Sequence, residues 1–359
     1  MTIRMVGVEE EFLLLDPDTG RVRPAAPLIM PSAPVDAQQE ITREQIEVGT
    51  PPLISLAELR ASLLRLRRAT AAAARSAGVA IAALATSPLP ATPTTTGDER
   101  YRQIVRRYAR TGREQLTCGC HVHVSVRSRA EAVGVLDRIR PWLGCLIAIS
   151  ANSPFWQGED TGYASWRTQL WQRWPSAGPT ELFGSVKAYD DLANALTASG
   201  TILDRKMLYF DARPSEHLPT IEVRVADVCL SVDNAVLVAG LVRALVATAA
   251  GEWARGVPPV PARSELLRMA QWQASKSALE GDLVDVVNRQ PVPAEMLLAE
   301  LTRHVKVELD RAGDTTLVAA GLRRLLREGT AAVRQRAAYA RRGDLVDVVR
   351  DAIEATVAG

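Results

Sequence analysis

The chain has 359 residues, of which 47% are hydrophobic and 23% are charged, and its formal net charge is +2. This balance is typical of a globular protein and argues against a disordered chain or a general nucleic-acid binder. The sequence has no run of about 18 apolar residues and no signal-peptide pattern, so we expect a cytoplasmic protein without a membrane segment. Four cysteines in this length do not make a disulfide framework, and free thiols are expected.

The first expected element is a strand within residues 5–16, where acidic residues interrupt an apolar run. Side chains alternate between the faces of a strand, so Glu9 and Glu11 share one face and Phe12 lies on the other. Two neighbouring carboxylates raise each other's pKa unless a cation neutralises them. Mg²⁺ takes oxygen ligands and keeps positions for water and phosphate, which makes it the natural candidate. A solvent-facing acidic strand is the alternative interpretation.

A second strand is expected in residues 40–48. Its second half alternates polar and apolar residues, as a half-buried strand does, and places Glu47 on the polar face. Ser55 and Glu58 then have the spacing of a capping box, in which each side chain satisfies a free backbone N–H at the start of a helix. This spacing predicts a helix that ends near Gly78.

The third informative strand is expected over residues 117–126. Its apolar face carries Cys118 and Cys120, and its other face carries His121 and His123. Two thiols and two imidazoles could bind zinc, but strand alternation places them on opposite faces. A core role for the cysteines is therefore favoured. A pair of hydrogen-bonded surface histidines is the plain alternative to a functional role for the imidazoles.

Further along the chain, the pattern predicts one helix over residues 130–150. Residues 152–184 are rich in Trp, Gly and Pro, which favours a long, structured loop over a packed helix. A fourth strand is expected over residues 220–225, with Glu222 and Arg224 on the face opposite to its valines.

From Val232 onward the pattern is almost wholly helical. A cluster of prolines at positions 258, 259 and 261 is the best candidate boundary. We expect a mixed α+β region over residues 1–255 and a helical C-terminal part over residues 256–359, packed on the same domain.

These strands repeat one design, with an apolar face and a face that bears Glu, His or Arg. If the polar faces meet in a concave sheet, their acids suit two or three divalent cations that hold a nucleotide's phosphates. If they meet water, they are ordinary solvated faces. No glycine-rich phosphate loop and no grouping of a nucleophile with a base can be argued from spacing. The acids concerned are Glu9, Glu11, Glu40, Glu47 and Glu222.

Five segments resemble, in order and spacing, the carboxylate–amine ligase family, also called type 2 glutamate–cysteine ligases. The resemblance is close over residues 1–255 and looser in the helical tail. It implies an α+β fold like that of glutamine synthetase, in which a curved, mainly antiparallel sheet forms a funnel backed by helices, with residues 1–255 as the catalytic region. The segments are residues 7–16, 40–51, 118–126, 166–179 and 211–227.

The resemblance also implies an activity, which is the ATP-dependent formation of an amide bond, plausibly γ-glutamyl, through an acyl phosphate, with ATP going to ADP and phosphate. The expected substrates are a carboxylate such as glutamate and an amine such as cysteine, and the expected cofactor is Mg²⁺ or Mn²⁺. A homodimer is expected, with no nucleic-acid or membrane partner. The metal ligands that the resemblance implies are Glu9, Glu11, Glu40, Glu47, His121 and Glu222.

Other roles follow from the same resemblance. Arg224 matches the arginine beside the transferred phosphate, and it is expected to act in both catalysis and nucleotide binding. Arg213 is a second expected catalytic residue, and His123 and Arg167 are expected nucleotide contacts. Lys276 stands where the family pattern has an arginine, which leaves the amine substrate open.

Two alternatives come from other classes. A metal-dependent amide hydrolase could use the same acids and histidines, and it would cleave an amide without nucleotide. A non-catalytic sensor would bind Mg-ATP or a metabolite and release no ADP.

Overall fold

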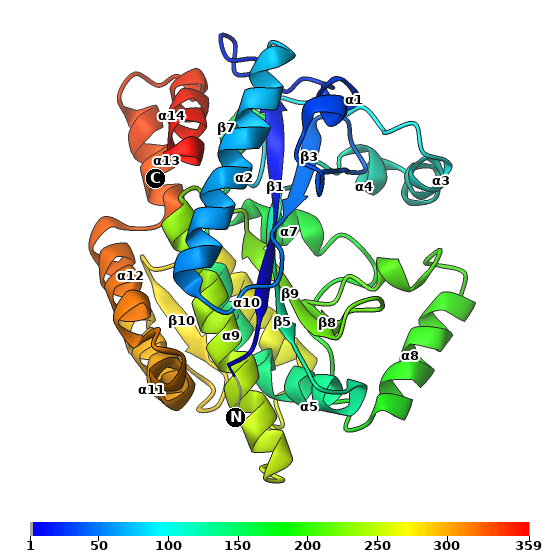
Figure 1. Ribbon diagram of the computed structural model, residues 1–359, viewed down its shortest axis with the longest axis vertical. Helices are drawn as coiled ribbons and strands as arrows, with labels where there is room; N and C mark the ends of the chain where they lie inside the picture. Colours follow the sequence, from blue (N-terminus) through cyan, green and yellow to red (C-terminus); the bar gives the residue numbers. More distant parts are fainter. Residues whose placement is uncertain (1–2, 359) are drawn as a thin grey trace.

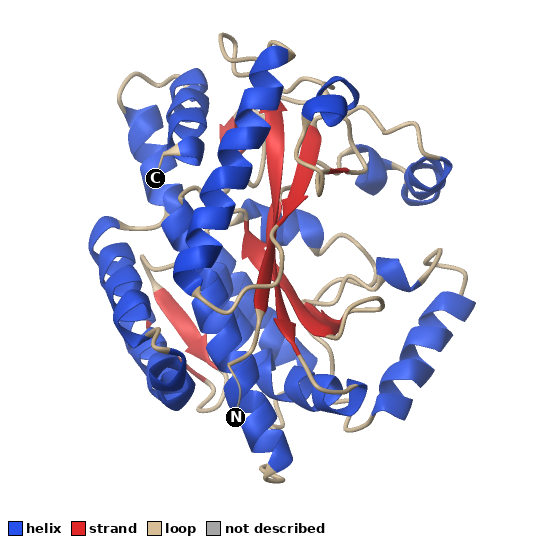
Figure 2. Ribbon diagram, viewed as in Figure 1, coloured by secondary structure: helices blue, strands red, loops and turns tan. Residues whose placement is uncertain are grey.

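The computed structural model describes residues 3–358 as a mainly antiparallel sheet surrounded by helices (Figure 1, Figure 2). The strands are β1 (Val6–Leu15), β2 (Gln38–Gln39), β3 (Gln45–Gly49), β4 (Ala80–Ala82), β5 (Gly119–Ser125), β6 (Phe155–Trp156), β7 (Glu159–Asp160), β8 (Ala212–Pro214), β9 (Thr220–Asp227), β10 (Asp282–Asp285) and β11 (Gln290–Pro293). The α-helices are α1 (Ala26–Ile29), α2 (Leu56–Ser76), α3 (Glu99–Tyr108), α4 (Arg110–Arg113), α5 (Arg129–Ile139), α6 (Leu143–Ser150), α7 (Trp166–Trp171), α8 (Val186–Ala198), α9 (Val232–Ala254), α10 (Ser264–Ser277), α11 (Ala294–Ala312), α12 (Thr315–Glu328), α13 (Ala331–Ala340) and α14 (Leu345–Val357).

The main sheet has the strand order β2-β3-β1-β5-β9-β8, and β4 pairs with the end of β1. Each pair of strands in it is antiparallel. β1 lies at its centre, with β3 on one side and β5 on the other. The predicted α+β class with a mainly antiparallel sheet is therefore confirmed, and the sheet is open.

One face of the sheet is covered by α9, together with α2 and α5, and Figure 1 shows α2 and α9 crossing one side of β1. Val6 and Val8 of β1 and Val122 of β5 are at most 1% exposed against these helices. α9 is long and apolar enough to span a membrane by length and composition, although Arg243 interrupts its run of apolar residues. Because 83% of that apolar window is buried inside the fold, α9 is the core helix of the protein.

The helix predicted from the capping box is confirmed as α2. Ser55 accepts hydrogen bonds from the backbone N–H groups of Ala57 and Glu58, and the helix ends at Ser76. The single helix predicted over residues 130–150 is instead two helices, α5 and α6, joined by a 3₁₀ turn that contains Pro141. Proline lacks the N–H that a continuous helix needs, which explains the break.

Three other expectations were wrong in part. Residues 152–184 contain the helix α7, which packs on β9 and α10, and the β6–β7 hairpin. These tertiary contacts stabilise a helix of six residues that its composition did not favour. The β10–β11 hairpin interrupts the helical tail. The strand expected over residues 40–48 is β3, which begins only at Gln45, so Glu40 lies in the irregular segment that precedes it.

The C-terminal helices pack directly on the rest of the chain. α10 contacts α6 and α7, α11 and α12 contact α9, and α14 contacts α2 and β4. In Figure 1 the helices α11 to α14 lie along the left side of the molecule. The division of the chain at residue 255 stays a prediction.

Candidate functional site

The polar face of the sheet gathers the predicted residues from strands that are distant in sequence. β1, β3, β5 and β9 each turn acidic, imidazole or guanidinium side chains to this face because their apolar residues face the helices. Neighbouring strands place these side chains opposite one another in three cross-strand pairs, which are Glu11 with Glu47, Glu9 with His121, and His123 with Glu222.

One set of potential metal ligands, which we call the Glu9 group, consists of Glu9, His123 and Glu222. Each residue offers one ligand atom, and the three atoms lie within 4.8 Å of one another. Glu9 Oε1 is 3.2 Å from His123 Nε2, and Glu9 Oε2 is 3.6 Å from Nδ1 of His121. Burial opposes ionisation of Glu9, but hydrogen bonds with the two histidines and the charge of His123 outweigh it and hold its pKa well below the usual range. Glu9 is therefore a carboxylate.

Two arginines hold the third member of this group. Arg213 Nε donates to Oε2 of Glu222 at 2.7 Å, and Arg224 donates to Oε1. Burial alone would raise the pKa of Glu222, but the charges of Arg224 and Arg213 keep it well below the ordinary value. Arg224 lies two residues beyond Glu222 on β9, so both side chains emerge on the same face, as predicted.

A second set, the Glu11 group, consists of Glu11, Glu40 and Glu47, whose ligand atoms also lie within 4.8 Å of one another. Glu40 reaches it from the segment between β2 and β3, where its carbonyl accepts a hydrogen bond from the hydroxyl of Thr96 at 2.6 Å. Burial and the charge of Glu40 raise the pKa of Glu11 to about 8, and burial with the neighbouring acids raises the pKa of Glu47 well above normal. Three crowded carboxylates cannot all ionise unless a cation neutralises them.

Buried nitrogen atoms accompany these two groups. Nε of Arg167, Nε of Arg224 and Nε2 of His121 have no hydrogen-bond partner among residues 3–358. Burial and the charge of Arg224 lower the pKa of His121 to about 4, so its imidazole is neutral. The two guanidinium Nε atoms are donors, and because buried donors without acceptors are rare in folded proteins, they favour an anionic ligand.

Three contributors to this arrangement were not predicted, and Trp171 is the first. Its ring centroid lies 5.7 Å from the guanidinium carbon of Arg167 and 5.6 Å from that of Arg224. A tryptophan ring attracts guanidinium groups at this distance, so one side chain positions two arginines. No local pattern in the sequence signals this role.

Gly119 is the second contributor that was not predicted. Its backbone N–H donates to Glu11 Oε2 at 2.6 Å. A Cβ atom at this position would lie less than 3.0 Å from Nη2 of Arg167 and 2.9 Å from Nε2 of His121. Strand alternation places Gly119 on the same face as the histidines, so the pattern did contain a signal for it.

Asp227 is the third contributor that was not predicted. Its carboxylate accepts hydrogen bonds from the hydroxyls of Ser153 and Ser165, at 2.8 and 2.9 Å, and from the backbone N–H of Asn152 at 2.8 Å. Ser165 caps the N-terminus of α7, the helix that carries Arg167. This buried network fixes the position of Arg167, and it joins residues about 60 to 75 positions apart, beyond the reach of any local pattern.

The donor atoms suit hard divalent cations. The Glu11 group offers only carboxylate oxygens, the ligands that Mg²⁺ prefers, and the Glu9 group adds an imidazole, which Mn²⁺ also accepts. The raised pKa of Glu11 and of Glu47 supports this fit, because a cation would remove the repulsion that raises it. Cys118 and Cys120 are buried in hydrophobic clusters and belong to neither group of potential metal ligands, which opposes the zinc alternative.

Comparisons with known proteins identify the family of this chain. The chain matches the model of glutamate–cysteine ligase family 2 over residues 5–351. A Frankia alni protein provisionally named glutamate–cysteine ligase 2-2 is 53% identical, covering 97% of this chain and 95% of its own length. A Streptomyces coelicolor protein provisionally named glutamate–cysteine ligase 2 is 45% identical, covering 99% of this chain and 100% of its own length.

Solved structures share the fold. A glutamate–cysteine ligase from Francisella tularensis, in complex with AMP, superposes with a TM-score of 0.72 at 14% identity, covering 100% of this chain and 90% of its own. A bifunctional glutathione synthetase from Pasteurella multocida gives a TM-score of 0.69 at 16% identity, covering 99% of this chain and 52% of its own. From the family match and the close relatives, this chain belongs to glutamate–cysteine ligase family 2 and is a carbon–nitrogen ligase.

Proposed function

We propose that this protein uses ATP to join a carboxylate, the γ-carboxylate of glutamate, to the amine of cysteine or of another amino acid. The observation that carries the proposal is the pair of acidic groups on one sheet face, accompanied by buried nitrogen donors that lack acceptors. This arrangement matches what a polyphosphate needs, which is cations for its charge and hydrogen-bond donors for its oxygens. The names of the relatives support glutamate and cysteine, and the AMP in the Francisella structure supports a nucleotide.

The residues that would hold Mg²⁺ or Mn²⁺ are the Glu9 group and the Glu11 group, together with His121. Bound there, a divalent cation neutralises phosphate charge and orients the phosphates for transfer. His121 is neutral, so its free Nε2 is available as a ligand or as a hydrogen-bond donor according to its tautomer.

In the proposed reaction, an oxygen of the substrate carboxylate bonds to the γ-phosphorus of ATP. The bond from that phosphorus to the bridging oxygen breaks, and ADP leaves. The amine nitrogen then bonds to the acyl carbon of the resulting acyl phosphate, phosphate departs, and the nitrogen gives up a proton as the amide forms. No protein nucleophile is required, so the protein contributes positioning and charge stabilisation.

Arg224 and Arg167 would stabilise the negative charge of the phosphoryl group in transfer, because both guanidinium groups are buried at the site and each has an unpartnered Nε. Arg213 would orient Glu222 through its hydrogen bonds to that carboxylate. His123 would contact the nucleotide phosphates or a cation beside Glu9.

The test is ADP release by the purified protein with glutamate and a matrix of amino acids and amines, first with Mg²⁺ and then with Mn²⁺. We expect ADP to appear only when both a carboxylate and an amine are present, together with one new amide for each ADP. Cleavage of an amide without nucleotide would support the hydrolase alternative. Binding of Mg-ATP with no ADP from any substrate pair would support the sensor alternative.

Family membership also leads us to propose a homodimer and a cytoplasmic location. Light scattering of the purified protein tests the first. Fractionation of the source cells tests the second.

A further inference from the structure

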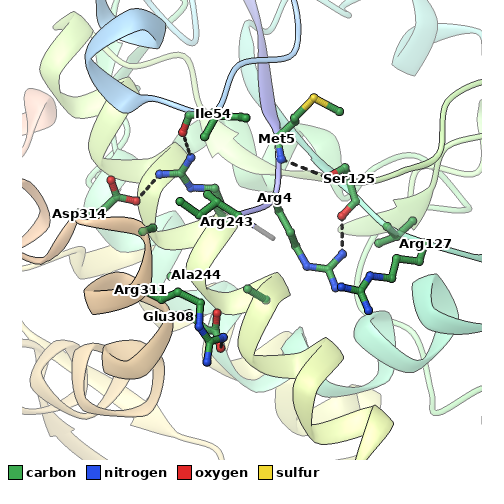
Figure 3. A pocket seen from close by; sticks show the side chains of 14 residues that line it. Arg4, Met5, Ile54, Ser125, Arg127, Arg243, Ala244, Glu308, Arg311 and Asp314 are labelled. Atoms are coloured by element: carbon green, nitrogen blue, oxygen red, sulfur yellow. Dashed lines mark hydrogen bonds and ion pairs between the residues drawn. The ribbon is translucent and has the colours of Figure 1, made fainter. Parts of the chain in front are cut away.

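A cavity of about 290 Å³ lies apart from the site described above (Figure 3). Its walls come from residues 3–5 before β1, the end of β5, α9, and the end of α11 with the turn that follows it. None of its lining residues belongs to the Glu9 group or the Glu11 group, although Met5 lies four residues before Glu9 and Ser125 two residues beyond His123, roughly 13 and 7 Å at the rise of an extended strand. The cavity is therefore a separate feature of the fold.

The acids that line this cavity are already paired. Glu308 accepts a hydrogen bond from Arg311, and Asp314 accepts one from Arg243, which also donates to the carbonyl of Ile54. Figure 3 shows Arg243 reaching Ile54 and Asp314 on one side of the cavity. No lining carboxylate is thus left to attract a cation.

The lining side chains that can still form hydrogen bonds are arginines, which carry positive charge. Arg4 donates to Glu131 at 2.6 Å and to the carbonyl of Ser125 at 2.5 Å, whereas the guanidinium of Arg127 has no ion pair or hydrogen bond with any residue in 3–358. Nε of Arg243, a residue only 2% exposed, is also buried without a partner. Arg127 is exposed, so its unpaired guanidinium can reach an anion in the cavity, whereas the buried Nε of Arg243 cannot.

The rest of the wall is apolar, formed by the side chains of Met5, Ile54, Val126, Ala244 and Ala247. An inorganic anion would leave these groups in contact with water, whereas a ligand with a hydrocarbon body would bury them. The volume is at the lower limit of small-molecule pockets, which start at about 300 Å³. We propose that this cavity binds a small organic monocarboxylate, with its carboxylate toward the guanidinium of Arg127 and its apolar body against α9.

The proposal is independent of the ligase reaction, and calorimetry with the full-length protein tests it. The probe is 3-phenylpropanoate, and its neutral amide is the matched control. We expect the carboxylate to bind at least about tenfold more tightly than the amide, because a charge-assisted hydrogen bond contributes that much. Acetate and inorganic phosphate should bind more weakly than the probe, because neither fills the apolar part. Equal binding by the amide, or by phosphate, overturns the proposal.

Variants locate the binding. Arg127→Ala should weaken 3-phenylpropanoate about tenfold or more, whereas Arg129→Ala, which removes an exposed arginine paired with Asp190, should not change it. Ala247→Phe fills the cavity and should abolish binding, and Ala247→Leu is the milder variant if the larger ring disturbs folding. Binding that persists in Arg127→Ala, or that is lost in Arg213→Ala, overturns the proposal, because the second result would place the probe in the ligase site.

Discussion

Glu10 and Arg67 form an ion pair in which both side chains are fully buried, with Oε1 to Nη2 at 2.5 Å and Oε2 to Nε at 2.9 Å. Glu10 lies between the two acids of the polar face, and alternation turns it to the opposite side of β1, toward α2. Arg67 also donates to the carbonyls of Cys229, Leu230 and Thr356, so this one guanidinium joins β1, α2, the segment between β9 and α9, and the C-terminal helix α14.

This ion pair predicts a large loss of stability when one partner is removed. Arg67→Ala leaves a buried carboxylate without its counter-charge, and we expect the free energy of unfolding to fall by about 3–5 kcal/mol. Urea denaturation measures it. The adjacent Arg68→Ala is the control, because that residue is exposed, and it should change stability by about 0.5 kcal/mol or less. Equal effects of the two variants would contradict the structural role of Arg67.

The crowding of the Glu11 group predicts opposite effects on stability and on metal binding. Glu47→Gln removes a carboxylate whose pKa is raised by burial and by its acidic neighbours, so the metal-free protein should melt at a higher temperature. The same change should reduce the stabilisation that Mn²⁺ or Mg²⁺ provides, because a bound cation stabilises only the state that holds it. Melting curves with EDTA and with each cation measure both effects. Exposed Glu354→Gln is the control, and undiminished stabilisation of Glu47→Gln by metal would refute the site.

We expect one methyl group added at Gly119 to reduce activity. In Gly119→Ala, the new Cβ would overlap Arg167 and His121, and because these are side-chain atoms the fold should survive while they shift. We expect weaker Mg-ATP binding and turnover reduced by tenfold or more, since small displacements of positioning groups slow catalysis strongly (about 10²-fold per Å). Gly144→Ala, whose Cβ would find its nearest neighbour at 3.7 Å, should leave kcat and KM unchanged. Wild-type kinetics in Gly119→Ala would show that Arg167 and His121 need no fixed position.

We expect removal of the Arg224 side chain to reduce turnover without disturbing the fold. Arg224→Ala should keep the native circular dichroism spectrum and lose roughly 10²- to 10³-fold in kcat, the effect expected when one donor to transition-state charge is removed. ADP release under saturating substrates measures kcat, and Arg129→Ala is the surface control. Near-normal ADP formation in Arg224→Ala would remove this residue from the proposed mechanism.

We expect the titration of Asp211 to make the folding stability of the protein depend on pH. Burial raises its pKa to about 7, although its Oδ2 accepts a hydrogen bond from Gln271 at 2.7 Å. Between pH 4 and 7 the unfolded chain has lost this proton and the folded chain retains it, so stability falls as pH rises, by at most about 1.4 kcal/mol per pH unit, and levels off above pH 7. Asp211→Asn removes the titration.

Asp211→Asn should therefore melt at a higher temperature than the wild type at pH 8, and close to it at pH 4, where the wild-type carboxyl is protonated. Differential scanning calorimetry across this range measures the difference. A difference in melting temperature that does not change with pH would contradict the assignment.

Much of the polar face was predictable because strand alternation is a local property. The period of two assigns Glu9 and Glu11 to one face of β1, and His121 and His123 to one face of β5, whatever the rest of the chain does. The capping box at Ser55 likewise predicts the start of α2 from adjacent residues. Resemblance to a family then predicted that these faces meet.

Features built from distant contacts were not predictable in this way. The helix α7 forms because it packs on β9 and α10, and its six residues have too little intrinsic helical preference to reveal it. Trp171 contacts Arg224 across 53 positions in sequence, and Glu10 meets Arg67 across 57. No periodic pattern encodes such a pair.

The sequence by itself thus determined which side chains share a face of each strand, because backbone geometry sets that alternation residue by residue. Only the tertiary structure decided which faces adjoin, and so which acids crowd together, which donors stay without acceptors and which arginines share Trp171. The physical reason is that pairing between strands depends on the burial of apolar surface over the whole chain, which no short segment contains.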